Sequence, residues 1–312
     1  FAENHIAWQL AFNKSEESWD FDRGVITMGG DVMQTADTQG LHIRGSTSEL
    51  ILKDWISFSR NGEKRDSVVD LVRSVDLTIN NFHYIGQHLR GHRFRVDRSA
   101  AEWLVQLDGE DVVGSIFVPY DFNSERKMVF DMKRLRLPGD KTQANLISKL
   151  DPRELPAMQL KAAEFAFGDR YFGAIEATLE KTEQGLVATK ISTSDTSFKI
   201  DGTGRWFIDD EDILGSHSFF DAILTSTDVE QTMARLNYAP EIDSKELSVD
   251  FDLNWSGSPH PGFLEILNGE VQIQLGTGQL KEVEPGAGRV FGLMSIIALP
   301  RRLALDFRDV FN

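Results

Sequence analysis

The segment from Glu246 to Trp255 alternates between polar and apolar side chains, and this alternation constrains the fold more than any other feature. Its apolar members are Leu247, Val249, Phe251, Leu253 and Trp255. A period of two is typical of an extended strand with one apolar and one solvated face. The pattern recurs along most of the 312 residues. The chain therefore has many apolar faces, which either bury one another or stay open for a ligand.

Turns rich in glycine or polar residues separate the alternating segments, as expected for an antiparallel meander. The other alternating segments are 6–12, 41–45, 75–79, 103–107, 114–118, 128–132, 173–179, 198–206 and 271–275. Helical patterns are few: Val229–Leu236 after a capping Asp228, Leu50–Phe58, and Val290–Ala298. The sequence thus predicts a mainly β fold with a few short helices.

No Pro/Ser-rich linker divides the chain, so we expect one continuous segment over residues 1–312. A degenerate echo at an offset of 82 to 83 residues predicts repeat units near 75–120 and 158–206. A turn and a helix are expected within 285–303. Because the sequence starts at Phe1 without Met, we expect a piece of a longer protein.

Composition excludes several classes of function. Lys+Arg 33 against Asp+Glu 49 gives a formal charge of −16, which argues against a nucleic-acid partner because phosphates need clustered cations. The absence of cysteine removes disulfides, thiolate metal sites and cysteine nucleophiles, and it fits a bacterial periplasm. No apolar run reaches the length of about 18 residues that a spanning helix needs.

Two motifs resemble ligand sites without meeting their requirements. The segment Gly286–Gly292 departs from the G-x-G-x-x-G spacing of a dinucleotide loop and lacks a surrounding βαβ pattern. His83, His88 and His92 lie close together, but glycines interrupt any helix that would bring them onto one metal. We therefore expect no cofactor and no metal.

Charged segments give no defined site either. The acidic run Asp209–Asp212 lacks the order of a calcium-binding loop. No carboxylate pair stands out for glycoside hydrolysis and no nucleophile elbow is present, so no catalytic residue is predicted. A basic zone is interpreted as a solvated strand face or as a contact for lipid headgroups. It comprises Arg126, Lys127, Lys133, Arg134, Arg136 and Lys141.

The C-terminal part carries a more specific signal. Segment 285–289 is followed by 292–303 and 305–307, and together they resemble the YhdP branch of the AsmA-like proteins. Segments 151–156 and 202–206 support the resemblance. The residues that carry its motif are Gly288, Arg289, Pro300, Arg301, Arg302, Asp306 and Phe307.

This resemblance implies a long, curved antiparallel sheet with an open apolar groove, in an envelope protein of Gram-negative bacteria. It implies a non-enzymatic, periplasm-spanning conduit that carries phospholipids between inner and outer membranes. The expected partners are phospholipid acyl chains and the remainder of the same chain, including an N-terminal anchor in the inner membrane. The expected location is the periplasm.

The alternation indicates which side chains would line the groove. Apolar side chains suit such a lining because each buried CH₂ of an acyl chain contributes roughly 0.8 kcal/mol. The candidates are Leu77, Ile79, Val105, Leu107, Ile116, Val118, Ile175, Leu179, Phe198, Ile200, Leu247, Val249, Phe251, Leu253, Val271, Ile273 and Leu275. A structural β-sandwich or solenoid module for envelope assembly or glycan binding is the alternative, and it predicts two sheets packed face to face.

Overall fold

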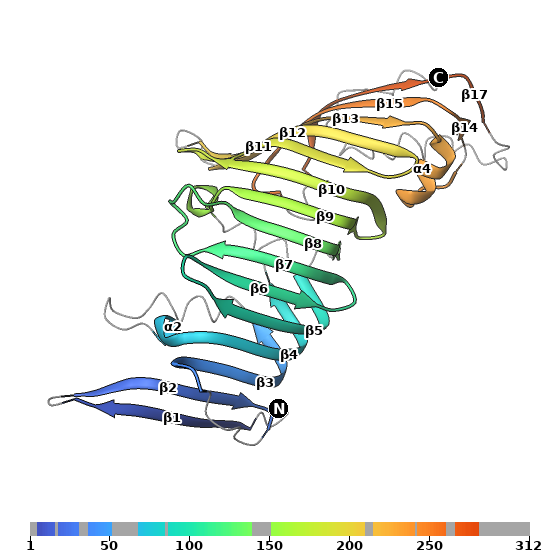
Figure 1. Ribbon diagram of the computed structural model, residues 1–312. Coiled ribbons are helices and arrows are strands. Elements are labelled where there is room, and N and C mark those ends of the chain that lie inside the picture. The colour runs from blue at the N-terminus through green and yellow to red at the C-terminus, as the bar shows by residue number, and fades with distance from the viewer. Residues whose placement is uncertain are drawn as a thin grey trace. The chain divides into compact units, whose positions relative to one another are not determined.

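The computed structural model describes residues 5–15, 18–30, 37–51, 68–84, 87–138, 151–209, 215–240, 242–259 and 266–280. Fifteen strands form one open sheet in chain order, and most neighbouring pairs are antiparallel (Figure 1). The predicted mainly β, open and largely antiparallel sheet is thereby confirmed. That the sheet forms a lipid groove stays a prediction.

The chain divides into two compact units, residues 1–135 and 136–312. Unit 1 contains β1 (Ile6–Lys14), β2 (Trp19–Met28), β3 (Gly40–Ile51), α2 (Val68–Leu71), β4 (Val72–Tyr84), β5 (Gln87–Arg98), β6 (Glu102–Asp108), β7 (Val112–Pro119) and most of β8 (Met128–Leu137). Unit 2 contains the 3-10 turn η2 (Pro152–Glu154), β9 (Met158–Phe167), β10 (Arg170–Lys181), β11 (Gly185–Ser194), β12 (Phe198–Ile208), β13 (Ser216–Ser226), α4 (Val229–Arg235), β14 (Ile242–Ser244), β15 (Leu247–Ser256), β16 (Asn268–Leu275) and β17 (Gly278–Leu280). Strands β14 and β17 pair separately from the main sheet.

The sheet departs from the predicted antiparallel meander at β3, which runs parallel to both β2 and β4. The connections before and after β3 are long, and parallel neighbours require such crossovers, whereas antiparallel strands need only a tight turn. The helix predicted from Leu50 is wrong at its first two residues, because Leu50 and Ile51 still pair with β4. The rest of that segment and the helix predicted at Val290–Ala298 lie outside the described residues.

The helix predicted after Asp228 is confirmed as α4. The Asp228 side chain accepts a hydrogen bond from the backbone N–H of Gln231, so it satisfies one of the donors that a helix start leaves free. Val229 and Met233 are buried with Ile242 of β14. The apolar spacing and the cap are both local, which explains why the sequence predicts this element.

Several strands contain extra residues that shift the pairing register. Such shifts occur in the pairs β1–β2, β3–β4, β7–β8, β9–β10, β10–β11 and β11–β12. Extra residues of this kind bend and twist a strand. Figure 1 shows that β4 and β5 also bend along their length, although the pairing between these two strands has no such shift. Gly45 has a φ of +121°, and a Cβ there would lie 2.0 Å from the carbonyl oxygen of Met28. Only glycine lets β2 and β3 approach this closely.

The predicted repeat units correspond to two runs of four strands, β4–β7 and β9–β12. Strand β5 begins at Gln87 and β10 at Arg170, while β6 begins at Glu102 and β11 at Gly185. Both pairs of strand starts have the spacing of the sequence echo. That one run arose as a copy of the other stays a prediction.

Candidate functional site

One side of each unit's sheet is lined by apolar side chains in rows that cross the strands. In unit 1, successive cross-strand partners form two such rows. They are Trp8, Ile26, Ile43, Val75, Val96, Val105, Ile116 and Phe130, and Ile6, Met28, Gly45, Leu77, Phe94, Leu107, Gly114 and Met132. Neither row contains a charged or polar side chain. We call this side the apolar face of unit 1.

Unit 2 has an apolar face of the same kind. Its rows are Ala162, Ile175, Thr193, Ile200, Leu224, Val249 and Ile273, and Leu160, Ala177, Ile191, Gly202, Ala222, Phe251 and Val271. Thr193 is the single polar member. All other side chains in both rows lack hydrogen-bonding groups, so these surfaces can accept hydrocarbon without desolvating a polar group.

The predicted lining residues all lie on these two faces. Unit 1 holds Leu77, Ile79, Val105, Leu107, Ile116 and Val118, and unit 2 holds Ile175, Leu179, Phe198, Ile200, Leu247, Val249, Phe251, Leu253, Val271, Ile273 and Leu275. That they line a lipid path stays a proposal. The family-motif residues from Gly288 to Phe307 lie outside the described residues.

Burial varies along the apolar face of unit 1. Ile43 and Leu77 near its middle are buried, and Val105 and Ile116 are half-buried. Trp8 on β1 is 66% exposed although it belongs to the same row. Large exposed apolar side chains cost free energy in water, so a row that ends in them points to a surface kept for a partner or ligand.

In unit 2, small buried clusters cover part of the apolar face. Phe198, Leu224 and Val249 form one cluster, against which Leu236 after α4 packs. At the other strand ends Leu253, Trp255 and Leu267 form another. Further along the face, Ile273 and Leu275 on β16 are each 47% exposed.

Three polar side chains at these strand ends donate hydrogen bonds within the protein. The indole N–H of Trp206 donates to Ser216 Oγ at 2.8 Å, and that of Trp255 donates to the carbonyl oxygen of Ser258 at 3.0 Å. Ser218 Oγ donates to the carbonyl oxygen of Gly257 at 2.8 Å. These three hydrogen bonds hold Trp206, Trp255 and Ser218 in place without a charged partner.

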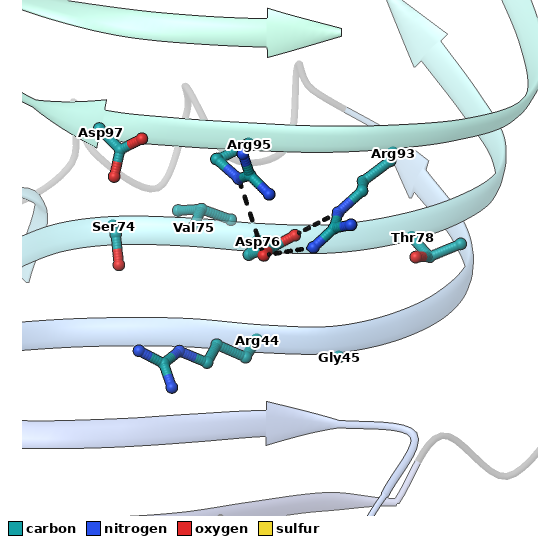
Figure 2. Close-up of a pocket in the computed structure, with 9 residues that line it drawn as sticks. All are labelled: Arg44, Gly45, Ser74, Val75, Asp76, Thr78, Arg93, Arg95 and Asp97. Carbon is teal, nitrogen blue, oxygen red and sulfur yellow. Dashed lines mark hydrogen bonds and ion pairs between the residues drawn. The ribbon is translucent and has the colours of Figure 1, made fainter. Parts of the chain in front are cut away.

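The opposite, polar face of unit 1 carries ion pairs. A hollow of about 500 Å³ lies there. Figure 2 shows the side chains of Asp76 and Arg93 pointing toward each other in it. Arg93 donates to both carboxylate oxygens of Asp76, at 3.0 and 2.9 Å, and Arg95 lies 3.8 Å away. The hydrogen bond from Arg93 holds the pKa of the Asp76 carboxyl below its usual value, against the opposing effect of burial. Ser74, which also lines the hollow, shares a hydrogen bond of 2.7 Å between its Oγ and Nδ1 of His42.

The polar face of unit 2 is similarly charged. Lys190 Nζ lies 2.8 Å from Glu176 Oε2, and this hydrogen bond lowers the pKa of the Glu176 carboxyl. Asp221, Asp252 and Glu270 occupy directly opposed positions on neighbouring strands. Within the described part of the chain, no group of three His, Asp or Glu side chains is arranged to hold a metal ion.

The other sequence motifs are only partly described. His92 lies on the apolar face opposite Ile79, where burial lowers the pKa of its imidazole. Arg136 of the basic zone pairs with Glu164 at 3.6 Å, and Arg134 donates to the carbonyl oxygen of Glu110 at 2.9 Å. Segment 286–292, residues 210–212, Lys141 and the side chains of 83 and 88 lie outside the described residues.

Sequence reasoning nominated 4 of the 16 residues in the two rows of unit 1 and 6 of the 14 residues in those of unit 2. It nominated no lining residue on β1, β2, β3, β5, β8, β9, β11 or β13, although in β5 Phe94 and Val96 alternate, as do Phe220 and Leu224 in β13. The alternation was present, but arginines in β5 and serines in β13 obscured it. A count of apolar residues at every second position would have found both strands.

Within the described residues, no helix has both the length and the apolar character needed to cross a membrane.

The sequence matches the family described as "YhdP protein" over residues 2–312. It is 27% identical over 179 residues to the "Intermembrane phospholipid transporter YhdP" of Escherichia coli (strain K12), covering 56% of this chain and 14% of that protein. This chain therefore spans a small part of that relative's length. No solved structure matches.

Proposed function

Because the chain belongs to the YhdP family, we propose that its two apolar faces carry the acyl chains of phospholipids. The chain would be a non-enzymatic segment of a conduit that crosses the periplasm and moves phospholipids between the inner and outer membranes. The remainder of a longer chain, anchored in the inner membrane, would complete it. The relative's name as an intermembrane phospholipid transporter supports this proposal.

The observation that carries the proposal is the continuity of the apolar rows. In unit 2 every described strand from β9 to β13, together with β15 and β16, contributes an uncharged side chain to each row. An acyl chain gains free energy from burial alone, roughly 0.8 kcal/mol per CH₂. The exposed positions of these rows offer similar surfaces, so a lipid lying on them would meet low barriers to movement along the face.

The polar faces support the same assignment. Charged side chains such as Glu176 and Lys190 point to the side of the sheet opposite the apolar face. A sandwich or solenoid module would need a second large sheet against the apolar face. Among the described residues the second sheet has two short strands, β14 and β17. The geometry therefore favours the conduit over the structural module.

Photocrosslinking along β15 and β16 tests the proposal. A photoreactive amino acid replaces Phe251 or Ile273 on the apolar face, or Asp252 or Gln272 on the polar face, in chain produced in a Gram-negative bacterium. We expect lipid adducts, identified by mass spectrometry, at Phe251 and Ile273 and not at their polar neighbours. Equal labelling at all four positions, or no phospholipid adduct at Phe251 and Ile273, would contradict the proposal.

A further inference from the structure

At several strand ends, cations stack on aromatic rings beside the apolar faces. The clearest case is in unit 1, where the guanidinium carbon of Arg98 lies 5.3 Å from the ring centroids of both Trp103 and Tyr120. The two rings meet edge to face, with centroids 5.6 Å apart. Tyr120 is itself held by a hydrogen bond from its hydroxyl to the carbonyl oxygen of Ser99 at 2.6 Å. The cation thus lies against a fixed aromatic surface.

The register places this cluster at the border of the apolar face. Arg98 follows Phe94 and Val96 at every second position of β5, so it is the last residue of that strand on the apolar side. Its partner Trp103 pairs in turn with Val118 of β7. A charged group here is adjacent to hydrocarbon and remains 27% exposed to water.

The protein occupies only part of the hydrogen-bonding capacity of Arg98. Its guanidinium donates to the backbone carbonyl of Asp70 and lies 3.7 Å from Asp70 Oδ1. The Asp70 side chain is largely exposed, and exposed ion pairs of this kind contribute little. A guanidinium has five N–H donors in one plane, and stacking on a ring uses its face and leaves its edge available.

Unit 2 has related contacts near the turn between β9 and β10, where Arg235 also lies 3.6 Å from Asp195 Oδ1. Arg170 stacks over Tyr238 at 5.6 Å, and Arg235 stacks over Tyr171 at 5.0 Å. Phe172 beside them packs against the apolar cluster that contains Phe198. Arginine, tyrosine and tryptophan favour the boundary between water and hydrocarbon because each combines an apolar body with a polar end.

We propose that the cluster of Arg98, Trp103 and Tyr120 binds the phosphate group of a phospholipid. This inference rests on the proposed function, because the acyl chains of that lipid lie on the apolar face of unit 1 beside Val96 and Val118. The planar guanidinium edge matches two phosphate oxygens, and charge-assisted bonds of this type are stronger than neutral ones.

Binding of short-chain lipids to the purified chain tests the proposal. The probes, all below their aggregation concentrations, are dihexanoyl phosphatidylglycerol, dihexanoylglycerol without phosphate, and inorganic phosphate. Titration calorimetry compares the unmodified chain with Arg98→Gln, Arg98→Lys and the control Arg93→Gln. Arg93 lies on the same strand but points to the polar face, where it pairs with Asp76. Circular dichroism checks that each variant is folded.

We expect Arg98→Gln to weaken phosphatidylglycerol binding about tenfold, as for loss of a charge-assisted hydrogen bond, and to leave dihexanoylglycerol binding unchanged. Arg98→Lys should fall between, because it keeps the charge and loses the planar edge, and Arg93→Gln should match the unmodified chain. Equal effects of Arg98→Gln and Arg93→Gln, or equal loss of both lipids in Arg98→Gln, would overturn the headgroup site alone. Inorganic phosphate bound as tightly as the lipid would show a free-phosphate site and contradict the proposal. Failure of both lipids to bind the unmodified chain would overturn the proposed function as well.

Discussion

The two units bear the same kind of apolar face but differ in what covers it. In unit 2, Leu236 after α4 packs over Phe198, Leu224 and Val249, so that end of the face is a small hydrophobic core. In unit 1 the face continues to β1, where Trp8 is 66% exposed and Phe12 is 48% exposed. Alternation therefore produces an apolar surface that can be buried. Whether that surface is hydrophobic core or binding surface depends on which other elements pack against it.

The largest difference in stability between the two units is expected when one phenylalanine is truncated in each of them. Phe198→Ala should lower the free energy of unfolding by about 3–5 kcal/mol, because it leaves a cavity in a buried cluster. Phe12→Ala, at a half-exposed position of β1, should cost less than about 1 kcal/mol. Urea unfolding followed by circular dichroism measures both. Similar losses would show that the faces do not differ in coverage.

A substitution at Asp228, the N-cap of α4, tests which interactions hold this helix in place beside the apolar face of unit 2. Asp228→Ala should destabilise α4 by about 1 kcal/mol, because the N–H of Gln231 loses its acceptor. Hydrogen exchange of the α4 amides would report the change as faster exchange. Asp228→Asn should restore most of the protection because its side-chain oxygen still accepts that bond. Unchanged exchange in Asp228→Ala would mean that packing of Val229 and Met233 alone holds the helix.

Acid should weaken unit 1 through its buried histidines. Burial lowers the pKa of His92 below the ordinary value of 6.5, against the opposing effects of the Arg90 backbone, Asp108 and Asp111. The unfolded chain therefore binds the proton first, and stability should start to fall as the pH drops below 6.5 and continue until the folded-state pKa is reached. Burial also lowers the pKa of His42, so His92→Gln should reduce the acid sensitivity without abolishing it.

This pH dependence is measured by urea unfolding of the unmodified chain and His92→Gln at pH 7.5 and pH 5.5. The expected result is a smaller difference between the two pH values in the variant. An identical difference in both proteins would show that the imidazole of His92 is not the titrating group.

The smallest effect is expected on the polar face. Arg93→Gln removes the two hydrogen bonds to Asp76, but the Arg93 side chain is 54% exposed. Water replaces these contacts, so the unfolding midpoint should shift by less than can be resolved. A clear loss of stability would show that the ion pairs of Figure 2 hold β4 and β5 together. The comparison would then have to include the polar faces.

The sequence by itself determined which side chains can share a face. Leu247, Val249 and Phe251 must point the same way in any strand, because the geometry of an extended chain alternates its Cβ atoms. It also determined α4, since the apolar spacing and the cap at Asp228 lie within one short segment. Local physics suffices for such features.

Only the tertiary structure decided which strands are neighbours and where the alternation slips. Ala188 and Ile191 of β11 both lie on the apolar face although they are three residues apart, because an extra residue shifts the pairing between them. The parallel pairing of β3, the cover over Phe198 and the meeting of Arg98 with Tyr120 likewise join residues distant in the sequence. Such contacts depend on the balance between burial and chain entropy over the whole unit, which no local pattern encodes.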